Sequence, residues 1–554
     1  MDHKKSPQHE EKKEAASDGK RRWKLPSISS RTLFILVILL AGIVWFGFYS
    51  VHTKEIAGSD DREYASIARN IVNGKGIVRN FIYPVDINFF EKLPVPEFLH
   101  PPGYPLILAA SFKLFGISER SALIPSYLAY FFLVILVFFF AKRFLGVKTA
   151  AIAAVLLALN KEILDVSLVA LSEPIYCLAF LLFFVLFVKA KSLGEIFLAG
   201  VLLGIGHLIR ENIYPFLLPL LVYLYFQPDL SRWKKMTVFA VGILIPIIPN
   251  MVRSYLDTGS PFFSYGKFPL MAYTMKYPWL NIYRDIQNPS LFEFLTETPG
   301  QFLLKYLGNI TNILDQLLSV SNPYVMAFFM LEMFHWNLSP EWRRVKILFL
   351  FLVVSQICFI AVFTFTPRFI IPFLPMMILF ASQSIVRVSE DLISRAGLRW
   401  RKGVPYLFVL LFLVLFIRPA AYAIFQPMKP EGLGFKAPQY GFLIPEKEAK
   451  RLNNFLNSEL KENQVVWTDL PEVLEWEGDR LCGWLPTRIQ SIYEIQKKIP
   501  VDAILLTNIQ TPYKLEEEWR YLLFSEHNLP KYRTVKLYRG QMVLAKLLIR
   551  DDKD

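Results

Sequence analysis

Long runs of apolar side chains constrain this 554-residue chain more than any other feature of its sequence. The run Leu33–Val51, for example, carries no charged residue. A transmembrane helix needs about 20 consecutive, mostly apolar residues, and several runs reach or approach that length. Hydrophobic residues make up 54% of the sequence, more than an ordinary soluble domain contains. The sequence therefore predicts a polytopic, α-helical membrane protein.

The charged residues between the apolar runs indicate how the chain crosses the membrane. Cytoplasmic loops are enriched in Lys and Arg, and the basic stretch Lys20–Lys24 precedes the first run. This places the N-terminus in the cytoplasm, and every later loop on that side is also basic. With about eleven segments, the C-terminus lies outside. The segments are expected near residues 33–51, 121–142, 147–160, 168–189, 194–209, 212–227, 236–252, 323–337, 346–366, 368–387 and 404–424.

Composition and motifs exclude several classes of function. The basic cytoplasmic loops explain the net charge of +14, and no basic-aromatic repeat points to a nucleic-acid partner. The three cysteines, Cys177, Cys358 and Cys482, form no disulfide framework. The sequence has no ATPase-type phosphate loop and no HExxH or CxxC motif. No small-residue cleavage site follows the first apolar run, so we interpret it as a retained membrane helix.

The hydropathy pattern divides the chain into three parts. Residues 1–31 form a polar cytoplasmic tail, and residues 32–427 form the transmembrane part, with large outer loops near 52–120 and 253–322. In residues 428–554, short apolar runs typical of strands alternate with stretches typical of helices. We predict that this C-terminal part is a small α/β domain on the extracytoplasmic side.

Ionisable residues gather at the outer ends of the predicted segments. Charged groups at membrane depth are costly, so they usually face a partner or a water-filled cavity. Acids and arginines that are far apart in the sequence therefore share one surface, which predicts an outward-facing polar site. These residues are Asp60, Asp61, Glu173, Arg210, Glu211, Arg253 and Arg368.

The segment 58–76 follows the first apolar run and opens with two adjacent carboxylates. Its apolar residues recur at helical spacing, and two glycines end it. Asp60 could be the N-cap of this helix, with Glu63 completing a capping box, which would make the acids structural. Alternatively, the acids bind a metal or remove a proton from a substrate. The segment by itself leaves these interpretations open.

Three further motifs lie at the outer ends of segments. Leu99–Leu106 holds three prolines and a glycine, which fix a rigid turn; its His100 either donates to a phosphate or hydroxyl or is a plain interfacial histidine. Glu173 stands before Pro174, where a carboxylate either suits a helix start or points into the outer cavity. A glycine-rich run with helix-packing spacing precedes Arg210, which could also reach the interface by snorkelling.

In their order along the chain, these motifs resemble those of the GT-C glycosyltransferases. They are similar to the branch that contains protein O-mannosyltransferases and bacterial lipid A aminoarabinose transferases. The resemblance covers roughly residues 33–390. It rests on Ser59–Ala65, His100–Pro105, Glu173–Pro174, the glycine-rich run to Arg210, and Pro367–Phe369.

The resemblance implies a GT-C fold, an outward-facing active site, a polyprenyl-phosphate-linked sugar donor and an inverting transfer. Asp60 and Asp61 match the two acids of the family's first outer loop, Tyr64 matches its tyrosine, and Glu173 matches the second acidic position. A basic residue often precedes the family's proline pair. His100 holds that position here, and an ordinary histidine is only partly charged at neutral pH.

Such a transfer needs a carboxylate base near the acceptor hydroxyl and cations near the departing phosphate. Asp60 is the candidate general base. Asp61 and Glu173 would assist it by positioning groups, or all three acids would hold a divalent cation such as Mg²⁺. The sequence indicates no other cofactor. The candidates for substrate binding are Tyr64, His100, Tyr104, Arg210, Arg253 and Arg368.

The expected partners are the lipid-linked donor, membrane lipids and an acceptor that is a glycan, a lipid or a protein. The expected location is a bacterial inner membrane. Two other functions fit a chain with many spans and buried charges: a transporter or flippase of lipid-linked sugars, and an oligosaccharide ligase or polymerase with diphosphate-linked donors. A transporter would more typically show inverted repeats and charges near the bilayer midplane, whereas these charges gather at one face.

Overall fold

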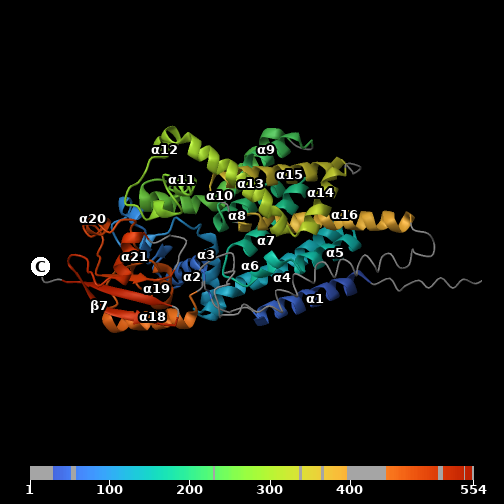
Figure 1. Ribbon diagram of the computed structural model, residues 1–554. Coiled ribbons are helices and arrows are strands. Elements are labelled where there is room, and N and C mark those ends of the chain that lie inside the picture. The colour runs from blue at the N-terminus through green and yellow to red at the C-terminus, as the bar shows by residue number, and fades with distance from the viewer. Residues whose placement is uncertain are drawn as a thin grey trace, which may run out of the picture.

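The computed structural model describes residues 29–51, 56, 58–228, 231–335, 340–363, 367–395, 444–509, 516–541 and 543–551. A bundle of helices forms one part of the molecule, and a sheet covered by helices lies at the other end, near the C-terminus (Figure 1). The basic stretch Lys20–Lys24, the expected segment 404–424 and the predicted boundary after residue 427 lie outside the described residues.

Apolar helices confirm the predicted α-helical membrane protein. Among the described residues, five helices are long and apolar enough to cross a membrane, and a bent pair meeting at 103° would make six. The described residues also include four shorter apolar helices. The expected number of about eleven membrane-spanning segments stays a prediction. The helices are α1 (Ser30–Val51), α4 (Glu119–Leu145), α5 (Val147–Ala158), α6 (Lys161–Ser167), α7 (Glu173–Lys189), α8 (Leu193–Ile209), α9 (Tyr214–Phe226), α10 (Arg232–Thr258), α13 (Pro299–Ser321), α14 (Pro323–Phe334), α15 (Pro340–Val362) and α16 (Leu374–Arg395).

The two predicted outer loops contain helices of their own. The helix α13 runs for 23 residues through what the sequence predicts as the second outer loop. Polar residues such as Lys305, Asn309 and Asp315 interrupt its apolar pattern, and it qualifies as a candidate span only together with α14, as the bent pair. The other elements of these loops are α2 (Ser59–Val72), β1 (Val78–Arg79), β2 (Phe81–Ile82), η1 (Pro84–Asn88), β3 (Val95–Pro96), α3 (Gly103–Phe115), α11 (Lys267–Met271), η2 (Asn281–Tyr283) and α12 (Leu291–Glu297).

Glycines let α8 and α10 pack backbone to backbone. A Cβ atom on Gly200 would fall on the carbonyl oxygen of Phe239, and one on Gly204 would fall on that of Ile243. Gly242 of α10 has the same relation to Phe197 of α8. The predicted packing role of the glycine-rich run is therefore confirmed, and the close contact fixes the end of α8 that carries Arg210.

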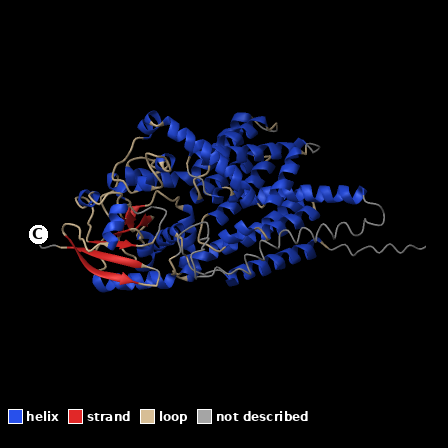
Figure 2. Ribbon diagram, viewed as in Figure 1, coloured by secondary structure: helices blue, strands red, loops and turns tan. Residues whose placement is uncertain are grey.

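The C-terminal part is an α/β unit, as predicted. Figure 2 shows its strands gathered at one end of the molecule. The sheet has the order β2-β5-β4-β6-β8-β7, in which β2, β5, β4 and β6 are parallel and β8 runs antiparallel to both of its neighbours, β6 and β7. Its elements are α18 (Glu446–Glu459), β4 (Val466–Thr468), α19 (Pro471–Gly478), β5 (Cys482–Trp484), α20 (Ser491–Ile495), β6 (Ala503–Thr507), α21 (Glu517–Phe524), β7 (Tyr532–Arg539) and β8 (Leu544–Arg550).

One strand of this sheet comes from the first outer loop. β2 pairs with β5, so that Phe81 lies opposite Cys482 and Ile82 opposite Gly483. A single hydrophobic core accordingly combines residues from both outer loops with those of the C-terminal part. The helix α2, which carries the acidic pair, therefore lies between the bundle and the sheet (Figure 1). Two short 3-10 turns, η3 (Pro367–Phe369) and η4 (Ile371–Phe373), lead into α16.

Candidate active site

The helix α2 presents its acids from the first turn rather than from its cap. Gly58 is the N-cap residue, with an extended backbone and no side-chain cap hydrogen bond. The interpretation of Asp60 as the N-cap is therefore wrong, because Asp60 is the second residue of the helix. Carboxylates in the first turn still complement the helix dipole, and their side chains are free to face other elements.

Four charged residues from four separate segments meet at the first turn of α2. Arg368, in η3, forms an ion pair with Asp60. The Nε atom of Arg368 lies 3.4 Å from Oε1 of Glu173, the first residue of α7. Nη1 of Arg210, at the C-terminal end of α8, donates to the same Glu173 oxygen at 2.6 Å. We call Asp60, Glu173, Arg210 and Arg368 the charged cluster.

The side chains of the charged cluster differ in their exposure to solvent. The side chain of Glu173 is 1% exposed and that of Arg210 is 12% exposed. The side chains of Arg368 and Asp60 are 19% and 27% exposed. Glu173 therefore lies at the closed end, where two guanidinium groups compensate its charge, and Asp60 lies at the open end.

The electrostatics of the charged cluster keep Asp60 ionised. Burial alone would raise the pKa of the Asp60 carboxyl, but the charge of Arg368, followed by that of His100, outweighs burial and holds the pKa below its ordinary value. Burial likewise disfavours the Arg368 cation, while Asp60 and Glu173 hold its pKa above the usual range. The ground state of the empty site is thus a carboxylate neutralised by a guanidinium group.

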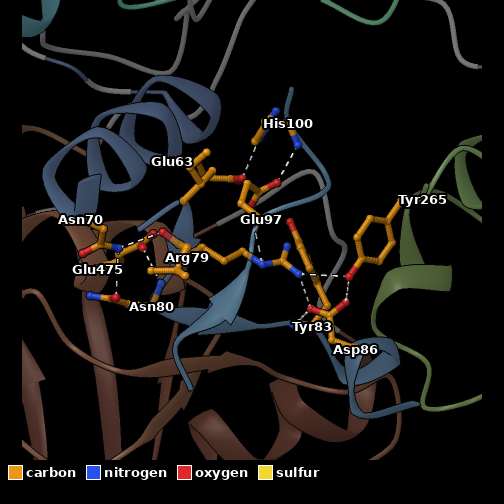
Figure 3. Close-up of polar contacts among 12 residues, drawn as sticks. Glu63, Asn70, Arg79, Asn80, Tyr83, Asp86, Glu97, His100, Tyr265 and Glu475 are labelled. Atoms are coloured by element: carbon orange, nitrogen blue, oxygen red, sulfur yellow. Dashed lines mark hydrogen bonds and ion pairs between the residues drawn. The ribbon is translucent and has the colours of Figure 1, made fainter. Parts of the chain in front are cut away.

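A second group of polar residues lies beside the charged cluster. Oε2 of Glu63 lies 2.8 Å from Nε2 of His100, and the backbone N–H of His100 donates to Glu97 at 2.6 Å (Figure 3). Burial lowers the pKa of His100, but the hydrogen bond from the ring to Glu63 and the negative charge of Glu63 raise it to about 9. His100 is therefore a cation at neutral pH, unlike the partly charged histidine that the sequence suggests.

A buried arginine stabilises the loop that carries His100. Arg79 forms an ion pair with Asp86 and places its Nε atom 3.7 Å from Glu97 (Figure 3). The hydroxyl of Tyr265, from the second outer loop, donates to Asp86 at 2.6 Å. Because Arg79, Asp86 and Glu97 are all buried, this network is costly to break and holds the turn that begins at His100.

The two predicted tyrosines pack edge to face behind the charges. The ring of Tyr64 lies 4.5 Å from that of His100 and 4.8 Å from that of Tyr104, centre to centre. Tyr64 is 6% exposed, and Tyr104 is fully buried. Tyr104 therefore packs behind Tyr64 instead of facing the open end of the site.

Asp61, Arg253 and Glu211 also lie outside the charged cluster. Asp61 is 3% exposed, and burial raises its pKa to about 6. Arg253 donates to the carbonyl oxygen of Glu97 at 2.8 Å and covers the ring of Phe98. Arg253 thus supports the first outer loop. Glu211 follows Arg210 and is exposed.

The acids do not form a ready metal site. Among the described residues, no three His, Cys, Asp or Glu side chains are grouped to hold a metal ion. Asp60 and Glu173 face arginines, and Asp61 is buried. The predicted cation between Asp60, Asp61 and Glu173 therefore does not fit the side chains as they lie.

Sequence reasoning missed the role of Glu63 in this site. The sequence suggests only a capping role for Glu63, whereas its carboxylate binds His100. Residues three apart on a helix share a face, so the spacing between Asp60 and Glu63 already indicates that both point the same way. The partner His100 lies 37 positions further along the chain, and sequence spacing gives no sign of that contact.

Comparisons with known proteins give one family-model match and several solved structures of similar fold. Residues 99–252 match a family model described as dolichyl-phosphate-mannose-protein mannosyltransferase. No curated protein sequence matches the chain. The fold is similar to that of ArnT from Cupriavidus metallidurans in the apo state, with a TM-score of 0.55, 14% identity, and coverage of 94% of this chain and 98% of that one.

Two further solved structures share the fold. One is the same ArnT bound to undecaprenyl phosphate, with a TM-score of 0.54, 15% identity, and coverage of 94% of this chain and 98% of that one. The other is the archaeal oligosaccharyltransferase AglB from Archaeoglobus fulgidus, with a TM-score of 0.52, 13% identity, and coverage of 86% of this chain and 69% of that one. The likeness to these solved structures is one of fold, and residues 99–252, which the family model matches, include His100, Glu173 and Arg210 of the site.

Proposed function

We propose that this protein transfers a sugar from a polyprenyl-phosphate donor to an acceptor hydroxyl on the extracytoplasmic side of a membrane, with inversion at the anomeric carbon. The observation that carries the proposal is the charged cluster, in which the accessible carboxylate of Asp60 adjoins the guanidinium group of Arg368. A carboxylate beside a cation is what a transfer with a phosphate leaving group requires. The resemblance to ArnT, which has been solved with undecaprenyl phosphate, supports this donor class.

In the proposed reaction, Asp60 removes the proton of the acceptor hydroxyl. The hydroxyl oxygen attacks the anomeric carbon of the sugar and forms the new glycosidic bond. The bond from that carbon to the phosphate oxygen breaks at the same time, and the phosphate leaves with the bonding electrons. A single displacement of this kind inverts the anomeric carbon. Arg368, Arg210 and His100 would stabilise the negative charge on the leaving polyprenyl phosphate.

Arg368 links donor binding to the strength of the base. In the empty site its guanidinium group neutralises Asp60 and also lies 3.4 Å from Glu173. A donor phosphate would compete with Asp60 for Arg368. As Asp60 loses this counterion, burial raises the pKa of its carboxyl, and the carboxylate becomes a stronger base when the donor is in place.

The proposal is tested with purified full-length protein and a radiolabelled polyprenyl-monophosphate sugar. We expect a covalent sugar–acceptor product from this donor and none from the diphosphate donor. The Asp60→Asn variant should lose roughly 10²–10⁴-fold in kcat, the usual contribution of a general base. Asp285→Asn, at an outer-loop acid away from the cluster, should remain active.

Three outcomes would contradict the proposal. A product from the diphosphate donor would indicate the ligase or polymerase alternative. Movement of the donor across vesicles without a glycosylated product would indicate a flippase. Full activity of Asp60→Asn would remove Asp60 from the role of base.

A further inference from the structure

The helix α19 of the C-terminal part lies along α2, the helix that carries Asp60 (Figure 1). Near the end of α2, Nη1 of Arg69 donates to the carbonyl oxygen of Trp476 at 2.7 Å, and Nη2 lies 3.1 Å from Asp479. At the start of α2, the hydroxyl of Ser59 lies 2.8 Å from Oε1 of Glu472. The C-terminal part thus holds the helix at both ends.

The two hydrogen bonds at Ser59 need more protons than its hydroxyl group can supply. The Ser59 hydroxyl lies 2.8 Å from a carboxyl oxygen of Glu472 and 3.3 Å from one of Glu63. A hydroxyl has one proton to donate, and an ionised carboxylate can only accept. If both glutamates were ionised, one of these two contacts would therefore lack a proton. One carboxyl group must carry a proton for both hydrogen bonds to exist.

The surroundings identify Glu472 as the protonated group. Glu63 already accepts from His100, which is a cation. Glu472 is 5% exposed, and among the described residues no Lys, Arg or His lies within ion-pair distance of it. Burial, reinforced by the charge of Glu63, raises the pKa of Glu472 to about 8. The hydrogen bonds then run from Glu472 to Ser59, from Ser59 to Glu63, and from His100 to Glu63.

We propose that Glu472 is a positioning residue of the active site, which donates a hydrogen bond to Ser59 and thereby orients the Glu63–His100 pair and the first turn of α2. This gives the C-terminal part a role in catalysis, because one of its residues sets the geometry beside Asp60. The inference rests on the proposed function, since its main readout is sugar transfer. An error of about 1 Å in such geometry can cost 10²-fold in rate.

The test compares three single variants and one double variant with the wild-type enzyme in the sugar-transfer assay. Glu472→Leu removes the donor and should lower kcat/KM for the lipid donor roughly 10- to 100-fold. Glu472→Gln keeps an N–H that can donate to Ser59 and should remain within about threefold of wild type. Ser59→Ala removes the relay without altering α19 and should lower kcat/KM as Glu472→Leu does. The Ser59→Ala/Glu472→Leu double variant should be no worse than the poorer single variant, because both remove the same interaction.

A matched control separates positioning from loss of folding. Glu516, also in the C-terminal part, binds Arg284 of the second outer loop at 2.7 Å, away from α2. Glu516→Leu should lower the melting temperature while the remaining folded enzyme keeps its kcat/KM. If Glu472→Leu retains wild-type kcat/KM, or if Glu516→Leu loses as much, the inference is wrong. An inactive wild-type enzyme would instead contradict the proposed function, so the two failures are distinguishable.

Discussion

Each acid of the charged cluster faces an arginine that is distant in the sequence. Arg368 and Asp60 are 308 positions apart, and Arg210 and Glu173 are 37 apart. In each pair the arginine compensates the charge of the buried acid. Removing one partner would leave the other as an uncompensated ion, which is strongly destabilising. The same pairing sets the protonation state of Asp60, so the residue that neutralises the proposed base also determines the pH at which the base works.

Replacing Arg368 should therefore change the pH dependence of activity. In the wild type, Arg368 holds the pKa of Asp60 below its ordinary value against the effect of burial. In Arg368→Gln the effect of burial is less opposed, so the pKa of Asp60 rises. Activity that needs the Asp60 carboxylate would then be lost at a higher pH as the solution is acidified. We expect the acidic limb of kcat/KM to move up by about 1–3 pH units.

The measurement is kcat/KM against pH, with each profile normalised to its own maximum, because Arg368 is also proposed to bind the donor. Arg395, whose side chain is 76% exposed at the end of α16, provides the control. Arg395→Gln should leave the acidic limb where it is in the wild type. An unmoved limb in Arg368→Gln would show that Asp60 does not govern this ionisation.

At the scale of residues, the sequence identifies the charged residues of the site but not which of them contact one another. The positive-inside rule and the outer-end positions place Asp60, Glu173, Arg210 and Arg368 on one side of the membrane, and the structure brings these four together. The same reasoning groups Arg253 with them, although its side chain binds the backbone of the first outer loop. Position along a span fixes depth, whereas contact also depends on the rotation of each helix, which no local pattern reports.

At the scale of elements, long apolar runs were the most reliable predictors. The expected segments near 121–142 and 194–209 correspond closely to α4 and α8, because nearly uniform apolar runs have only one stable form in a membrane. Helix α13 was missed because its polar residues break the run. The glycine-rich run was interpreted correctly, since small residues at this spacing permit close helix contact.

That contact should be sensitive to any added side chain. A Cβ on Gly204 would fall on the carbonyl oxygen of Ile243, which belongs to the backbone of α10 and cannot rotate away. We expect Gly204→Val to destabilise the protein by about 1–3 kcal/mol, the usual cost of overpacking, and to lower the melting temperature in detergent. In α1, a Cβ on Gly42 would meet no atom within 4 Å, so Gly42→Val serves as the control. Equal melting temperatures for the two variants would contradict the close packing of α8 on α10.

At the scale of the whole molecule, the first outer loop joins the C-terminal part to the bundle. The sequence predicts a separate α/β domain after residue 427, and the strand-like runs near Val466 and Ala503 do form strands. It does not predict β2, which is two residues long and exists only through its pairing with β5. A strand this short has no periodic pattern, and its partner lies about 400 residues away.

The C-terminal part should therefore stay attached after the chain is cut. Besides the β2–β5 pairing, Arg62 donates to the carbonyl oxygen of Ile444 at 2.9 Å, and Arg284 donates to that of Leu485 at 2.7 Å. Both guanidinium groups are buried, and one hydrophobic core spans the contact. With a protease site inserted between residues 428 and 443, we expect the two fragments to co-elute on size exclusion after cleavage.

The outcome also bears on catalysis, because α19 supplies Glu472 from the smaller fragment. The cleaved complex should keep its sugar-transfer activity, whereas a chain that ends before residue 428 should lose it, since α2 would then lack the contacts at Ser59 and Arg69. Arg284→Ala provides a weakened interface for comparison, and its cleaved fragments should separate more readily. If the wild-type fragments separate without denaturant, the shared sheet and core do not hold the two parts together. If they stay together and the truncated chain is still active, the C-terminal part is dispensable for positioning the base.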